Sequence, residues 1–283
     1  MSKRLHVVFI ATFLQFTFLG LYSQELYVFS EPASNMPAKS LGLKYSRKSV
    51  KETELDHTHT SSRHMLETQF GINKKLMVHP SVTFSDMYSY EKMRFESAGL
   101  YLKYRFLSVD AIHRHFRAAL FAKGIVSRNE LQYEEITVDG DHTAIQCGLI
   151  LTQLINKLAI SSTLGITEIM DGERWLKYGG PRKFSYRNFT YSLSAGYLLF
   201  PRKYTSFDQP NFNLYCELIG SQGLDRKTSF VDIAPALQVI LKSTTKLNFG
   251  YRFELTGNTS RMASAGFLVS VEKTFLNALK KKK

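Results

Sequence analysis

The feature that most constrains the fold is a period-two alternation of apolar and small or polar side chains along most of the chain. It is clearest at residues 144–170, AIQCGLILTQLINKLAISSTLGITEIM, where two extended runs meet at Asn156-Lys157. Successive side chains of a strand point to opposite faces, so each run has one apolar face and one polar face. No helical period separates the runs to cover the apolar faces. Lipid is the candidate cover.

Extended segments of this kind recur about twelve times between Ser40 and Phe275. The connectors after odd segments are mostly long and polar, and those after even segments are mostly short. The long set is Ser49–Ser62, Asp86–Arg94, Ser127–Asp141 and Asp171–Ser185; the short set is Asn73–Lys75, Ser108–Ala111, Asn156–Lys157 and Ser243–Thr245. Long loops on one rim and short turns on the other are typical of bacterial outer-membrane barrels. The sequence predicts an all-β fold, a single antiparallel transmembrane up-and-down β-barrel of about 12 strands.

Five features depart from this pattern. Pro80 and Pro235 fall inside expected strands, where each removes a ladder donor. The connector Pro201–Asp208 is long for the rim of short turns. The alternation places Glu96 and Arg114 on the apolar face, near strand ends, where charged groups can reach lipid headgroups.

The N-terminus has the features of a secretory signal peptide. Lys3 and Arg4 precede an apolar run, Val7–Leu21, and a cut beside Gln24 fits the small-residue pattern loosely. An uncleaved anchor is the alternative. The expected organisation is a signal peptide at 1–24, a periplasmic N-terminal segment or plug at 25–39, the outer-membrane barrel at 40–275 and a basic tail at 276–283. The expected location is the cell outer membrane.

Three stretches carry a resemblance to known proteins: ELYVFSEPASNMPAKSLGLKYS, LYLKYRFLSVDAIHRHFRAALFAK and YSLSAGYLLFPRKYTSFDQPNFNLYCEL. They resemble an uncharacterised group of Gram-negative, Bacteroidota-like outer-membrane β-barrel proteins. The resemblance spans nearly all of the chain after the signal. It implies a barrel in the outer membrane and carries no catalytic motif or settled substrate. The tail LNALKKKK departs from the pattern of barrels that end on an aromatic residue.

Charged side chains on the polar faces are expected to line the lumen. A narrow barrel must pair such charges, so a paired structural interior is the first interpretation. A cationic wall that gives weak anion selectivity is the functional one. The predicted lumen-lining residues are Glu67, Lys103, Arg105, His113, His115, Arg117, Lys123, Glu217, Asp232, Arg252, Glu254 and Glu272.

Two histidine pairs are candidate metal ligands. His57 and His59 lie in the first long connector, and His113 and His115 begin the fifth segment, where i, i+2 spacing places both imidazoles on one face. Such pairs can bind Cu(II), Ni(II) or Zn(II) when further ligands are supplied. Solvated loop histidines and a polar lumen wall are the alternative interpretation.

The chain carries a net charge of +13, but it has no basic stripe interleaved with aromatics, so no nucleic-acid partner is expected. No G-x-S-x-G, H-E-x-x-H or phosphate-loop motif occurs, so neither an enzyme activity nor a cofactor is predicted. The predicted function is a small pore or a binding barrel for a small polar or ionic solute, with lipid and the barrel-assembly machinery as partners. A sealed structural or adhesive barrel and an outer-membrane hydrolase are the alternatives.

Overall fold

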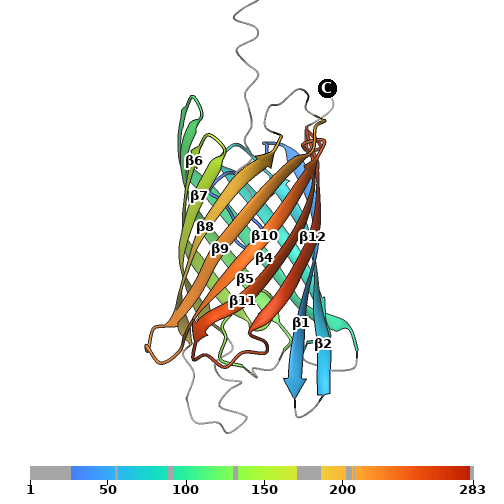
Figure 1. Ribbon diagram of the computed structural model, residues 1–283, viewed down its shortest axis with the longest axis vertical. Coiled ribbons are helices and arrows are strands. Elements are labelled where there is room, and N and C mark those ends of the chain that lie inside the picture. Colours follow the sequence, from blue (N-terminus) through green and yellow to red (C-terminus); the bar gives the residue numbers. More distant parts are fainter. Residues whose placement is uncertain are drawn as a thin grey trace, which may run out of the picture.

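The protein is a closed antiparallel barrel in a computed structural model (Figure 1), which describes residues 27–54, 57–87, 92–129, 133–170, 186–201, 206 and 208–280. Within them, twelve strands follow one another in chain order. The strands are β1 (Ser40–Glu54), β2 (His57–Gly71), β3 (Leu76–Ser85), β4 (Arg94–Ala111), β5 (Arg114–Ser127), β6 (Ala144–Ile155), β7 (Leu158–Ile169), β8 (Arg187–Phe200), β9 (Asn211–Gly223), β10 (Ser229–Leu241), β11 (Thr245–Gly257) and β12 (Ala265–Phe275). The described residues contain no helix long and apolar enough to cross a bilayer.

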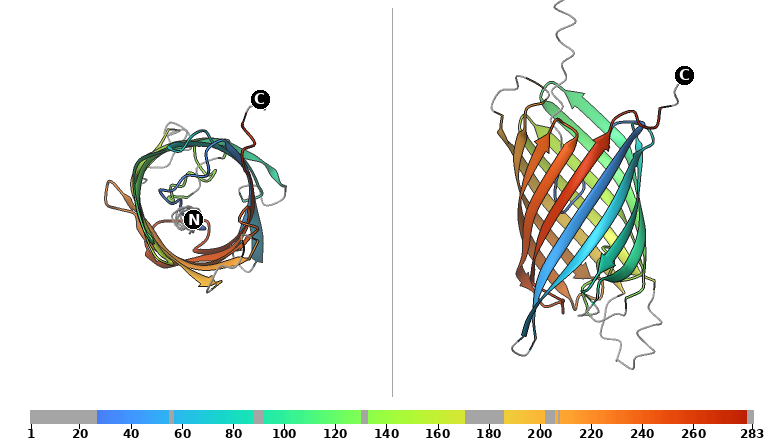
Figure 2. Two further views of the ribbon diagram at one scale, coloured as in Figure 1. Left: turned by 90° about the horizontal axis from the view of Figure 1, so that it is seen from above. Right: turned by 90° about the vertical axis from the view of Figure 1, so that its right-hand side faces the viewer.

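Every strand pairs with its neighbours in the chain, and β1 pairs with β12 to close the ring (Figure 2). The closing register runs from Leu41 opposite Phe275 to Val50 opposite Gly266. A closed ring has no strand edge, so the backbone groups of all strands bond within the protein, as a bilayer requires. The predicted fold is confirmed.

The two faces of the wall differ as the alternation predicts. Outward side chains are large and apolar, and many are exposed, among them Leu43, Leu164 and Leu237. Inward side chains such as Thr152 and Gln238 are polar and buried. Apolar residues exposed around a whole barrel are unusual in water, and they are normal against lipid.

The first hairpin is longer than predicted. Residues 49–54 and 57–62 were expected in a loop, yet β1 and β2 remain paired as far as Glu54 opposite His57. Figure 1 shows this hairpin projecting beyond the neighbouring strands. Apart from Val50, residues 49–54 and 57–62 are polar or charged in the sequence, so the apolar alternation that marks a strand in lipid is missing there. The ladder itself continues, because backbone pairing does not need an apolar face.

A β-bulge moves Glu96 from the predicted outer face to the lumen. The β3–β4 register shifts between Thr83 and Phe84, so that β4 carries one extra residue there. The extra residue re-aims the chain locally. Glu96 is consequently only 1% exposed and faces inward.

The turn between β6 and β7 agrees with the prediction. β6 ends at Ile155 and β7 begins at Leu158, so Asn156-Lys157 forms the two-residue connection. Asn156 has a φ of 55°, a left-handed conformation that asparagine tolerates better than most residues.

The outward apolar face generates a stability prediction. Replacing Leu164 or Leu237 with Arg should cost about 2–4 kcal/mol near the bilayer midplane, because the guanidinium would face hydrocarbon. The measurement is urea unfolding of the protein refolded into lipid vesicles. Leu224→Arg, in the β9–β10 loop, is the control and should cost little. Equal effects at all three positions would contradict the lipid-facing assignment.

Candidate functional site

Two segments of the chain enter the lumen from opposite rims. The first, residues 27–39, precedes β1 and enters at the rim of short turns; we call it the N-terminal segment. The second lies between β5 and β6 at the other rim and is described at residues 128–129 and 133–143, which we call the β5–β6 loop. Figure 2 shows the N-terminal segment inside the ring when the barrel is viewed along its axis. The candidate site lies between these two segments.

Glu217 of β9 holds the start of the N-terminal segment. Its carboxylate accepts hydrogen bonds from the backbone N–H groups of Val28, Phe29 and Ser30, each at 2.9 Å. The Ser194 hydroxyl donates a fourth bond at 3.1 Å. Glu217 is fully buried. One side chain therefore satisfies three consecutive backbone donors, which would otherwise be buried without partners.

Other wall residues bind the rest of the N-terminal segment. Lys103 donates to the Pro32 carbonyl at 2.7 Å, Arg117 to the Ser34 hydroxyl at 2.8 Å, and the Ala33 N–H to Thr152 at 2.8 Å. These bonds come from β4, β5 and β6. They fix the segment across the lumen rather than along one strand.

Apolar contacts complete the fit of this segment. Tyr27 packs edge-on against Tyr215, with ring centroids 5.6 Å apart. Phe29 lies over Gly250, where a Cβ would stand 2.5 Å from its ring. Glycine is therefore needed at position 250 for this close approach. Tyr27 and Val28 form a buried cluster with Tyr215 and neighbouring wall residues.

A buried ion-pair cluster anchors the β5–β6 loop. Arg63 of β2 donates two hydrogen bonds of 2.7 Å to Glu96 of β4, and it also contacts Asp141 of the loop. Asn129 donates to Glu96 at 2.6 Å. Val138 packs against the wall in an apolar cluster. A bidentate arginine–carboxylate pair is specific in geometry, so the cluster sets where the loop lies.

A second cluster joins this loop to the strand pair on the opposite wall. Arg261 of the β11–β12 connection pairs with Asp232 at 2.7 Å, Glu254 at 3.0 Å and Glu135 at 3.0 Å. Arg252 pairs with the same Asp232 and with Glu135. The two guanidinium groups contact three carboxylates, so each of these buried carboxylates has a cationic partner.

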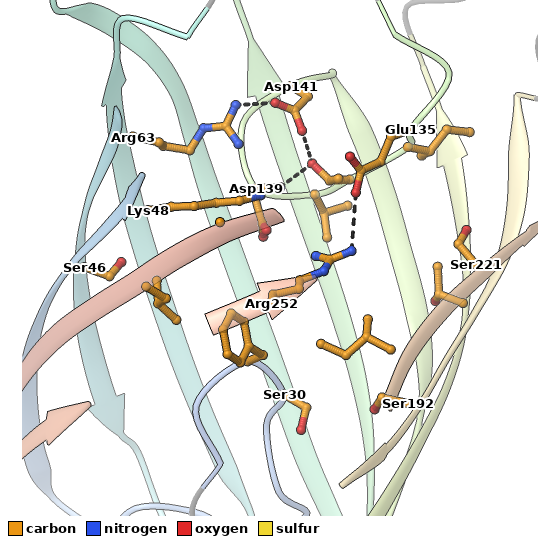
Figure 3. A pocket seen from close by; sticks show the side chains of 18 of the residues that line it. Ser30, Ser46, Lys48, Arg63, Glu135, Asp139, Asp141, Ser192, Ser221 and Arg252 are labelled. Carbon is orange, nitrogen blue, oxygen red and sulfur yellow. Dashed lines mark hydrogen bonds and ion pairs between the residues drawn. The ribbon is translucent and has the colours of Figure 1, made fainter. Parts of the chain in front are cut away.

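Between the two segments the lumen leaves a chamber of about 370 Å³. Figure 3 shows it with Ser30 of the N-terminal segment at one end and Asp139 and Asp141 of the loop at the other. The wall between them combines apolar side chains with charged and other polar ones. Its charged lining residues are Glu31, Lys44, Lys48, Arg63, Glu67, Lys123, Glu135, Asp139, Asp141, Arg252 and Arg261.

Most of the residues predicted to line the lumen do face it. Lys103, Arg117 and Glu217 bind the N-terminal segment, and Glu67, Lys123 and Arg252 line the chamber. Asp232, Glu254 and Glu272 form inward ion pairs, the last with Lys246 at 2.5 Å. Arg105 donates to the Lys74 carbonyl at the rim of short turns. His115 lies near the same rim, 2.8 Å from Asp110.

Of the two predicted histidine pairs, the structure describes only His113 and His115 with their side chains, and these two do not form a metal site. β5 begins at Arg114, and His113 lies exposed in the preceding turn with a φ of 57°, so it does not share a strand face with His115. The side chains of His57 and His59 lie outside the described residues. No group of three or more His, Cys, Asp or Glu residues suited to a metal ion occurs among those that are described.

Sequence reasoning missed the residues that hold the loop and its neighbours, Arg63, Glu96, Glu135, Asp141 and Arg261. Four of them belong to predicted connectors or their borders, and Glu96 is displaced by the bulge. The one available signal was the density of charge in the connector after β5, at residues 134–141. Polar loops are usually solvated, so that density alone does not indicate a loop folded inward.

The comparisons with known proteins concern the fold. An outer-membrane channel from Pseudomonas putida F1 is 11% identical, covers 88% of this chain and 100% of its own, and has a TM-score of 0.55. A KdgM porin (10% identical, covering 83% and 99%) and the β domain of the Bordetella autotransporter BrkA (13%, covering 83% and 99%) both have a TM-score of 0.45. No protein-family model and no curated protein matches the sequence. The first of these likenesses therefore places the chain in the outer-membrane type of barrel fold.

Glu217 generates the first prediction from this site. In Glu217→Ala the backbone N–H groups of Val28, Phe29 and Ser30 lose their shared acceptor, so these amides should exchange hydrogen at least about tenfold faster. Hydrogen exchange followed by mass spectrometry of the refolded protein measures this. The control is Glu254→Ala, which removes a carboxylate remote from the N-terminal segment. Unchanged exchange at residues 28–30 would refute the role of Glu217.

Asp141 generates a pH prediction. Burial opposes ionisation of its carboxyl, but Arg63 and then His142 outweigh that effect and hold its pKa below the ordinary value of 3.8. A lowered pKa means that its contribution to loop docking is complete above about pH 4 and is lost as the pH falls further. Methyl NMR signals of Ile136 and Val138 should keep their docked positions from pH 7 to 5 and shift only below about pH 4. Ile150, on the barrel wall, is the control; loop signals that move near pH 6 would contradict the assignment.

Proposed function

We propose that this protein is a narrow outer-membrane channel or solute-binding barrel that admits a small polar or ionic solute to its lumenal chamber. The observation that carries the proposal is the chamber of about 370 Å³ between two docked segments of the same chain, whose partly apolar wall also carries charged side chains. Small-solute sites are concave, preformed and lined by a few convergent polar groups. The chamber meets that description.

The N-terminal segment acts as a gate in this proposal. It crosses the lumen through hydrogen bonds and small apolar contacts, and it is continuous with β1 only at Ser40. Such a segment can leave without breaking the ladder of the wall. The β5–β6 loop, by contrast, is held by buried ion pairs of Arg63 with Glu96 and Asp141, which are stronger contacts than the hydrogen bonds that hold most of the N-terminal segment. The proposed path therefore opens at the rim of short turns.

A sealed structural barrel is the rival that the same geometry must exclude. Filling a lumen with paired charges is energetically no better than filling it with apolar side chains. The charged lining and the space it encloses are therefore unexplained if sealing is the only role. They are explained if a polar solute has to enter.

The hydrolase alternative has one contact in its favour. On the outer wall, the Ser62 hydroxyl lies 3.2 Å from His64 Nε2, and the Tyr45 hydroxyl lies 2.6 Å from His64 Nδ1. A nucleophile needs access to substrate, yet Ser62 is only 5% exposed. Its own N–H donates to Asp86 at 2.6 Å and cannot stabilise an oxyanion. These facts support a polar interfacial cluster, and they support a protein that is not an enzyme.

The location and partners belong to the same proposal. The apolar outer face and the outer-membrane type of fold support residence in the outer membrane, with lipid and the barrel-assembly machinery as partners. Export by a signal peptide at residues 1–24, and the resemblance to a Bacteroidota-like group, remain predictions from the sequence.

Conductance of the refolded protein in a planar bilayer tests the function. The intact protein should conduct weakly, and deletion of residues 27–37 should raise the conductance severalfold, because the segment blocks the lumen. A matched control replaces the same residues with a Gly/Ser sequence of equal length. This sequence lacks the side chains that fill the lumen, so the control should also conduct more than the intact protein. A barrel that folds but does not conduct after the deletion would support the sealed alternative and overturn the proposal.

A further inference from the structure

We propose that the chamber binds a small hydroxylated organic anion at a subsite formed by Lys44 and Lys48 of β1, His79 of β3 and Tyr101 of β4. All four residues line the chamber. The inference rests on the proposed function and deepens it by naming the class of solute, a molecule that carries carboxylate or phosphate oxygens together with hydroxyl groups.

The two lysines supply unused donors. Lys44 and Lys48 stand on the inward face of β1 on either side of the buried Ser46. Figure 3 shows Lys48 reaching from β1 into the chamber. Within the described part of the chain, neither ammonium group makes a hydrogen bond or an ion pair, although both line the chamber. Each can therefore donate to a ligand without losing a protein contact.

The carboxylates of the chamber are, by contrast, all engaged. The contacts are Glu31 with Lys103 at 3.3 Å, Glu67 with Gln69 at 2.7 Å, Glu135 with Arg261 at 3.0 Å, Asp139 with Lys123 at 3.2 Å, and Asp141 with Arg63. Glu67 and Glu31 act on Lys44 only from beyond contact distance. The subsite therefore attracts an anion through direct charge-assisted hydrogen bonds rather than through a large net charge.

His79 and Tyr101 give independent evidence for a ligand in the same chamber. Their rings lie 5.4 Å apart between centroids, and the residues are only 3% and 9% exposed. His79 Nε2 and the Tyr101 hydroxyl have no hydrogen-bond partner among the described residues. Buried polar atoms in folded proteins almost always have a partner. Two such atoms on neighbouring rings in the wall of a chamber indicate a polar ligand.

The chemistry of these atoms defines the ligand further. His79 Nδ1 lies 3.4 Å from the Glu67 carboxylate, so the tautomer that carries its proton on Nδ1 leaves Nε2 as an acceptor for a ligand hydroxyl. The Tyr101 hydroxyl and the two ammonium groups donate to oxyanion oxygens. A chamber of about 370 Å³ is at the small end of ligand sites, which suits a sugar acid or a hydroxycarboxylate.

Calorimetric titration of the full-length refolded protein with gluconate tests this subsite, with glucose as the neutral probe of similar size. Gluconate should bind and glucose should not. The double variant Lys44→Gln, Lys48→Gln should bind gluconate at least about tenfold more weakly, because two charge-assisted hydrogen bonds are lost. Lys51→Gln is the matched control, since Lys51 is exposed on the same strand and should not matter.

Tyr101→Phe separates a binding role from a structural one. Its hydroxyl bonds to no described residue, so its removal should leave the unfolding midpoint unchanged while weakening gluconate binding severalfold. Equal binding of gluconate and glucose would contradict the subsite, and so would unchanged gluconate binding by the lysine double variant. Neither result would contradict the proposed channel, provided that the variant lacking residues 27–37 conducts. Gluconate binding without conductance in that variant would overturn transport and keep the subsite.

Discussion

The backbone ladder that closes between β1 and β12 is the constraint on which the rest of the structure depends. In hydrocarbon an unpaired backbone group costs several kcal/mol, so strands survive there only in a closed ring. Closure then decides which side chains face which medium. Every second residue meets lipid and must be apolar, as Leu43, Leu164 and Leu237 are. The alternate residues face the lumen and are free to be polar.

A ring of twelve strands encloses a lumen that must be filled either by protein or by water. Barrels of about eight strands can be filled by side chains, and those of 16–18 strands hold an aqueous channel. This barrel lies between the two, and its own chain supplies the filling. Glu217 fixes the N-terminal segment through three backbone bonds, and Arg63 fixes the β5–β6 loop through Glu96 and Asp141. The chamber is the space left between two separately anchored pieces.

The wall of the barrel could be predicted from the sequence because alternation has a direct physical cause, and the turn at Asn156-Lys157 followed from it. The lumen could be predicted only in part. Lys103 and Glu217 were expected to face inward, but nothing local indicated that they bind residues 28–32. Glu96 required a register shift that only the pairing with β3 reveals. The inward fold of the charged loop depends on contacts with strands far away in the sequence.

The central claim is that the N-terminal segment occupies the lumen as a removable gate, and a reversible cross-link tests it most directly. The hydroxyls of Ser30 and Ser194 lie 2.9 Å apart, so Ser30→Cys with Ser194→Cys should form a disulfide once Cys147 and Cys216 are replaced by Ala. Conductance is then measured in one bilayer before and after reductant. The account predicts ready cross-linking, a closed barrel when oxidised and added conductance on reduction. Failure to cross-link, or a conductance indifferent to reductant, would contradict it.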